Sequence, residues 1–141
     1  MNKWLLFVLT AIALPGYCHA EQPETEQRQQ LFQQIEGNTE RLEDIIDQQD
    51  WQQVSTMALK LEQDVILLKK LFPQSSKGEW RSKEKIWHDW ENFEHKLTLW
   101  SISFKRIATT SQSKNHRQVI KAFDSATLSC RACHMQYRSL W

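Results

Sequence analysis

The sequence predicts an all-α protein, an antiparallel up-down-up-down four-helix bundle. Helix breakers are rare after residue 20, whereas Gln, Glu, Lys and Leu, which favour helices, are abundant. No strand-like alternation of useful length and no internal repeat is present. Apolar residues recur instead at spacings of three and four, which is typical of helices that pack in a left-handed bundle.

The first two helices are predicted at 24–48 and 51–71. Gly37 and the polar residues beside it make the middle of the first helix its weakest part. Asp50 is placed to act as the N-cap of the second helix, because its side chain can accept a hydrogen bond from an amide of the first turn. The two apolar stripes are Leu31, Phe32, Ile35, Leu42, Ile45 and Ile46, then Val54, Met57, Ala58, Leu61, Val65 and Leu68.

The third helix is predicted at 83–109, after a loop at 72–82 in which Pro73, two serines and Gly78 cluster. Ser82 is the expected cap of this helix. A fourth helix follows and runs toward the end of the chain. The two apolar stripes are Ile86, Trp90, Phe93, Leu97, Trp100, Phe104 and Ile107, then Val119, Phe123, Ala126, Cys130, Cys133, Tyr137 and Leu140.

Residues 1–20 have the features of a cleaved signal peptide. Lys3 supplies the positive charge, and an apolar run at 4–14 follows it. This run is too short to span a bilayer. Small residues at Cys18 and Ala20 fit the positions that precede a cleavage site. The sequence therefore predicts an exported, periplasmic protein with no stable membrane anchor after cleavage.

The remainder, 21–141, is predicted to form a single domain, which is large enough to bury one core. Once Lys3 is removed, 17 basic residues balance 17 acidic ones, and no basic tract is present. Neither a nucleic acid nor an anionic membrane is expected as a partner, because both are recognised through an excess of positive charge.

The strongest motif in the chain is Cys130-Arg131-Ala132-Cys133-His134. On a helix, where each residue advances by about 100°, the two cysteines and the histidine point to the same side. Two thiols at this spacing can add to the two vinyl groups of a haem, and the histidine can then place a nitrogen under the iron. The motif predicts covalently attached haem c, one per chain.

Two other kinds of site use the same residue types. A thioredoxin-like dithiol needs its motif at the start of a helix, where the thiol pKa is lowered. A tetrahedral zinc site needs a further set of protein ligands, and the remaining histidines offer no closely spaced pair. A haem-free helical protein that uses this motif for thiol redox chemistry or metal binding remains the alternative of another class.

Two segments, AFDSATLSCRACHMQYR and LFPQSSKGEWRSKEKIW, resemble the last helix and the loop before the third helix of the cytochromes c′. The resemblance covers most of the chain after residue 20, although Ser75 stands where the family usually has glycine. It implies an exported four-helix bundle with haem attached near the C-terminus. It also implies a homodimer that pairs through the first two helices, with Trp51 near that surface.

The resemblance also implies roles for individual residues. Cys130 and Cys133 would form the thioethers, and His134 would be the proximal ligand of the iron. Arg138 would lie beside the proximal pocket, Arg28 near a haem propionate, and Phe32 over the open face of the iron. Without the resemblance, both arginines are interpreted as solvated helix charges and Phe32 as ordinary core.

The sixth coordination position of the iron decides the function. The predicted first helix contains neither methionine nor histidine, and Met135 is next to His134 and cannot reach the opposite face. Met57 is interpreted as core filler, and the three remaining mature histidines, His88, His95 and His116, as solvent-facing.

Five-coordinate iron is therefore expected, in a protein that binds small diatomic gases (NO, CO), cycles between redox states and is not a turnover enzyme. An electron-transfer cytochrome with six-coordinate, low-spin haem is the alternative. No sequence feature identifies a redox partner protein.

Overall fold

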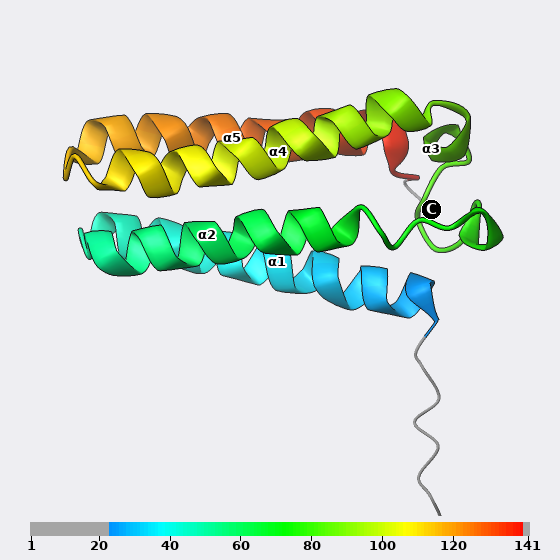
Figure 1. The fold of residues 1–141 in the computed structure, drawn as a ribbon, viewed down its shortest axis with the longest axis horizontal. Coiled ribbons are helices and arrows are strands. Elements are labelled where there is room, and N and C mark those ends of the chain that lie inside the picture. Colours follow the sequence, from blue (N-terminus) through cyan, green and yellow to red (C-terminus); the bar gives the residue numbers. More distant parts are fainter. Residues whose placement is uncertain (1–22, 140–141) are drawn as a thin grey trace, which may run out of the picture.

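The bundle predicted from the sequence is present in the computed structural model, which describes residues 23–139; the predicted signal peptide and residues 140 and 141 lie outside the described residues. Figure 1 shows α4 and α5 in one layer and α1 and α2 in the other. Each long helix packs on its neighbours in the chain, and α1 also contacts α5. The elements are α1 (Glu24–Asp47), α2 (Trp51–Leu68), η1 (Gln74–Ser76), α3 (Lys85–His88), α4 (Trp90–Ser111) and α5 (His116–Tyr137).

The ends of the first two helices follow the predicted signals closely. The α1 helix ends one residue before the predicted limit. Asp50 caps α2 as expected, since its carboxylate accepts a hydrogen bond from the amide of Gln53 at 3.1 Å. The α2 helix ends at Leu68, three residues early, and the chain continues in a turn in which the amide of Leu71 donates to the carbonyl of Leu68 at 3.0 Å.

The prediction of one continuous third helix is wrong, because the chain breaks at Asp89 between α3 and α4. The Asp89 carboxylate accepts hydrogen bonds from Asn92 at 2.6 Å and from the hydroxyl of Tyr137 at 2.9 Å. Short acidic side chains that bond nearby groups favour such interruptions over a regular helix. Ser82 does not cap α3: it is buried and forms an antiparallel bridge with Arg138.

The apolar stripes predicted from the sequence meet in the core. On α4, Phe93, Leu97, Phe104 and Ile107 are almost completely buried, and Trp90 at its start is half-buried. On α5, Val119, Phe123, Ala126 and Tyr137 are buried, and the two cysteines are half-buried against the same core. The sequence spacing thus placed the cysteine-bearing face of α5 correctly. Within residues 23–139 no helix combines the length and hydropathy needed to cross a membrane.

Candidate haem pocket

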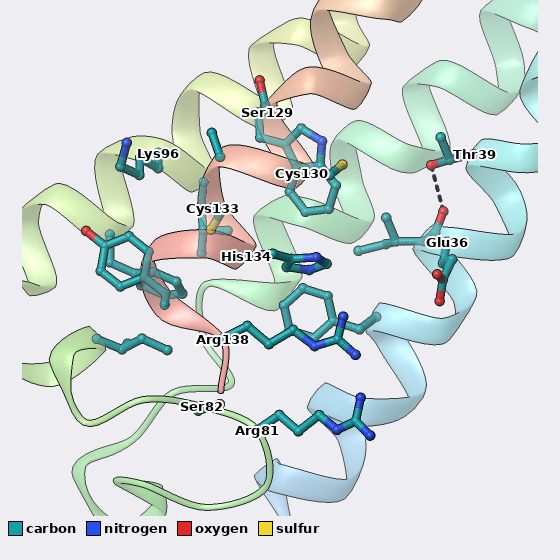
Figure 2. A pocket seen from close by; sticks show the side chains of 18 of the residues that line it. Glu36, Thr39, Arg81, Ser82, Lys96, Ser129, Cys130, Cys133, His134 and Arg138 are labelled. Atoms are coloured by element: carbon teal, nitrogen blue, oxygen red, sulfur yellow. Dashed lines mark hydrogen bonds between the residues drawn. The ribbon is translucent and has the colours of Figure 1, made fainter. Parts of the chain in front are cut away.

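A cavity of about 680 Å³ lies between α1, α4, α5 and the loop that precedes α3. Its volume is in the range of cofactor-binding cavities, which is roughly 300–1,000 Å³. Aromatic and aliphatic side chains form much of its wall, and a few polar groups converge on it, as Figure 2 shows. The apolar part of the wall consists of Phe32, Ile35, Phe72, Trp80, Ile86, Phe93, Leu97 and Trp100.

Cys130, Cys133 and His134 all line this cavity, as their helical spacing predicts. In Figure 2 the imidazole of His134 points into the cavity from α5, between Cys130 and Arg138. The two cysteines are not joined in a disulfide. One face of α5 thus presents two thiols and an imidazole to a single apolar space, which is the arrangement that covalent haem attachment requires.

Both thiols are poorly ionised at neutral pH. Burial, together with the neighbouring Cys133 thiol, raises the pKa of Cys130 to about 11. Burial also raises the pKa of Cys133, although Lys96 opposes this shift. Reactive dithiols need the reverse, a pKa lowered by a helix N-terminus or nearby cations. The motif lies in the C-terminal half of α5, where the helix dipole disfavours negative charge.

His134 is held in the form that can bind a metal. Partial desolvation in the cavity, with the positive charge of Arg138, keeps its pKa below the ordinary value, and Glu36 opposes this shift. At neutral pH the ring is therefore uncharged and one nitrogen keeps a free lone pair.

The wall across the cavity from α5 is supplied by α1. Phe32 packs against Trp80, with ring centroids 6.1 Å apart, and Ile35 is almost fully buried beside it. This wall is less apolar than the sequence indicated, because Glu36 and Thr39 also line it. The Thr39 hydroxyl is already engaged, since it donates to the carbonyl of Ile35 at 2.7 Å.

Among the described residues, no methionine and no histidine other than His134 lines the cavity. Met57 is half-buried on α2 and packs against the core, as predicted. His88 and His95 are exposed, also as predicted, whereas His116 is half-buried beside Trp51, with ring centroids 6.4 Å apart.

Arg28 lies beneath the loop and does not line the cavity. It is fully buried, and its guanidinium donates to the carbonyl of Leu71 at 2.9 Å, the hydroxyl of Ser76 at 3.0 Å and the carbonyl of Glu79 at 3.4 Å. The guanidinium carbon also stacks 4.6 Å from the ring centroid of Phe72. Contact of Arg28 with a haem propionate stays a prediction, and the interpretation of Arg28 as a solvated charge is wrong.

The indole nitrogen of Trp100 was not singled out from the sequence, where Trp100 was one member of a core stripe. It is buried and forms no hydrogen bond to nitrogen or oxygen among the described residues, although it is close enough to the Cys130 thiol to lower the pKa of that group, and the side chain lines the cavity. A buried donor left without such a bond suits a wall that binds a further polar group. Together with the two thiols and the imidazole, it indicates that the residues present fit a haem.

Comparisons with known proteins identify the family. The family model described as cytochrome c′ matches residues 24–138. No curated protein matches the chain. A solved cytochrome c′ is similar in fold, with a TM-score of 0.75 and 20% identity over 86% of this chain and 100% of that one.

Two solved structures from Alcaligenes xylosoxidans are similarly related. Each has a TM-score of 0.74 and 20% identity over 82% of this chain and 94% of that one. One is the recombinant native cytochrome c prime, and the other is the nitric oxide complex of a mutant of it. Because the family model spans most of the chain, this protein belongs to the cytochrome c′ family and its cofactor is covalently attached haem c.

Proposed function

We propose that this chain is an exported haem protein whose iron is five-coordinate and binds small neutral diatomic gases, NO above all, with redox cycling as part of its function. One observation carries the proposal: His134 is the only imidazole, and no methionine is present, in the described wall of the cavity. An iron held by His134 would then have no second strong ligand available from the described wall.

The residues of α5 would hold the cofactor. The sulfurs of Cys130 and Cys133 would carry the two thioether bonds, and His134 would supply the axial nitrogen. The depressed pKa of His134 supports this, because the uncharged ring has a lone pair to give. Haem bound in this way supplies an open coordination position and a one-electron couple.

The α1 wall would select among gases. Phe32 and Ile35 offer no hydrogen-bond donor and the Thr39 hydroxyl is committed to a carbonyl, so among these α1 residues only the amide of Gln33, which also lines the wall, is left as a donor. NO and CO do not depend on such a donor, whereas bound O₂ is stabilised by one. The nitric oxide complex among the similar structures supports the same choice of ligand. No acid–base or nucleophilic constellation suggests a turnover enzyme.

An optical spectrum tests the coordination state. Protein matured in a cell that attaches c-type haem is expected to give a high-spin spectrum in both oxidation states. A sharp low-spin spectrum with a methionine–iron charge-transfer band would contradict the five-coordinate proposal. It would favour the alternative of a six-coordinate electron carrier. Protein without covalent haem would contradict both.

Replacing Phe32 with alanine is expected to speed CO binding to the reduced protein by about tenfold, which corresponds to a barrier lowered by about 1.4 kcal/mol. The reason is that the Phe32 ring covers the cavity from α1 and is held there by Trp80. Flash photolysis measures the on-rate. The matched variant is Ile35→Val, which trims the neighbouring side chain. If only Ile35→Val speeds binding, Ile35 covers the iron and Phe32 does not.

Two further parts of the proposal concern the setting of the protein. Export to the periplasm is supported by the signal-peptide features of residues 1–20.

A homodimer through the first two helices is supported by the outer face of α2, where Leu59, Ile66 and Leu67 are 43%, 39% and 49% exposed. Trp51 is half-buried at the start of α2, where it packs against the core and against His116.

A further inference from the structure

A turn in the loop before α3 holds a tryptophan in a strained backbone conformation. The amide of Ser82 donates to the carbonyl of Glu79 at 3.2 Å, so Trp80 and Arg81 are the central residues of this turn. Trp80 has a φ of 53°, in the left-handed region. A positive φ at the first central position of a turn suits glycine and is costly for a bulky side chain. Strain of this kind commonly marks functional positions.

The other strained positions have an ordinary structural reason. Apart from glycine, Gln49 and Lys114 are the only other residues with a positive φ within residues 23–139. Both are exposed and follow the ends of α1 and α4, where a left-handed residue commonly terminates a helix. Trp80 terminates no α-helix, and its side chain contacts the wall of the cavity. The strain at Trp80 therefore needs a different explanation.

The backbone is held on both sides of Trp80. The carbonyl of Glu79 accepts a hydrogen bond from the buried guanidinium of Arg28 at 3.4 Å. The carbonyl of Arg81 accepts one from the amide of Ser139 at 2.8 Å. A strained residue persists only where the surrounding structure determines its conformation. These two contacts come from α1 and from the end of α5, so both walls of the cavity fix the turn.

The indole of Trp80 lies where the cavity meets solvent. It is 40% exposed and also lines the cavity, so one part of it faces solvent and another part faces the interior. Its ring packs against that of Phe32 on α1, with centroids 6.1 Å apart and planes inclined by 37°. Figure 2 shows the next residues of the loop, Arg81 and Ser82, on the side of His134 away from Cys130. The two rings thus join the loop to α1 by an apolar contact.

We propose that Trp80 covers the cavity between the loop and α1 and determines the size of the ligands that reach the iron, an inference that rests on the proposed gas-binding function. Phe32 would cover the iron itself, whereas Trp80 would close the way in from solvent. A diatomic gas can pass when side chains fluctuate. A branched ligand needs the indole to move away, and the backbone contacts on both sides of Trp80 resist that movement.

The test compares ligands that bind reduced iron in the same way but differ in size: CO, methyl isocyanide and tert-butyl isocyanide. Flash photolysis and stopped-flow mixing measure their on-rates with the reduced holoprotein. Trp80→Ala is expected to speed the binding of tert-butyl isocyanide by about tenfold and that of CO by less than about threefold. Methyl isocyanide should fall between them. Trp80→Phe, which keeps a ring at this position, should restore most of the exclusion.

Lys114→Gly is the matched control for backbone strain. It relieves a positive φ at an exposed position that does not line the cavity, so all three on-rates should stay at the parent values. At position 80, glycine and alanine should admit the bulky ligand equally. Trp80→Gly should nevertheless unfold at a urea concentration about half a molar higher than Trp80→Ala, because only glycine adopts the positive φ without cost.

The inference is overturned if Trp80→Ala binds tert-butyl isocyanide at the parent rate in folded holoprotein. It is also overturned if Trp80→Ala has no effect once Phe32 is replaced with alanine, since Trp80 would then act only by holding Phe32 in place. Failure of the proposed function is a different result, visible in the parent protein. That protein would then bind no CO, or would show the low-spin spectrum of a six-coordinate iron.

Discussion

Replacing Arg28 with methionine is expected to lower the free energy of unfolding by about 3 kcal/mol. Methionine keeps much of the side-chain volume but leaves the carbonyls of Leu71 and Glu79 and the hydroxyl of Ser76 without this donor. Each buried polar group that loses its partner costs about 1–3 kcal/mol. Stacking on Phe72 is lost as well. Urea denaturation of the holoprotein measures the change.

The matched control is Arg41→Met, which removes an exposed arginine from the same helix and should change stability by less than about 0.5 kcal/mol. The two roles of Arg28 predict different results. If Arg28 also contacts a propionate, Arg28→Met should shift the pH dependence of the reduction potential in addition to lowering stability. If it only anchors the loop, the effect is on stability alone. The buried position and three hydrogen bonds of Arg28 favour the second result.

The sequence predicted most of the helical framework because its signals are local. Stripes at spacings of three and four, the Asp50 cap and the scarcity of glycine and proline act within one helix, and the structure follows them. The position of Cys130, Cys133 and His134 on one face of α5 depends only on helix geometry, so it too could be predicted. The break at Asp89 was not predicted: one donor to its carboxylate, Asn92, is local, but the other, Tyr137, lies 48 residues further along the chain.

The other parts of the pocket depend on contacts between distant segments. Arg81 lies in a loop without periodicity, and backbone contacts with the end of α5, the bridge between Ser82 and Arg138 and the hydrogen bond from the Ser139 amide to the Arg81 carbonyl, bring it to the cavity. Trp80 has a positive φ of 53°. This conformation is uncommon for a residue other than glycine, so it could not be predicted from the residue type. Arg28 illustrates the converse: helix position alone suggested a solvated charge, whereas the loop folds over it and buries it completely.

The double replacement Cys130→Ala/Cys133→Ala is expected to abolish covalent haem. Both sulfurs face the cavity, and no other cysteine is present in residues 23–139 that could form a thioether in their place. Haem absorbance that remains with the chain on a denaturing gel, together with the intact mass, measures the effect. Each single variant keeps one sulfur beside His134 and should retain part of the covalent haem. Arg131→Ala, between the two cysteines, is the control that should retain all of it.

The same cysteines separate the haem protein from a haem-free dithiol. Protein produced without the haem-attachment machinery has both thiols available, and their raised pKa values predict slow alkylation at neutral pH. Because burial raises the pKa of Cys130 to about 11, its thiolate fraction and alkylation rate should keep rising up to that pH. A redox dithiol would instead contain one cysteine that is alkylated rapidly near neutral pH. Rapid neutral alkylation, combined with no covalent haem in the matured protein, would favour the dithiol and contradict the haem site.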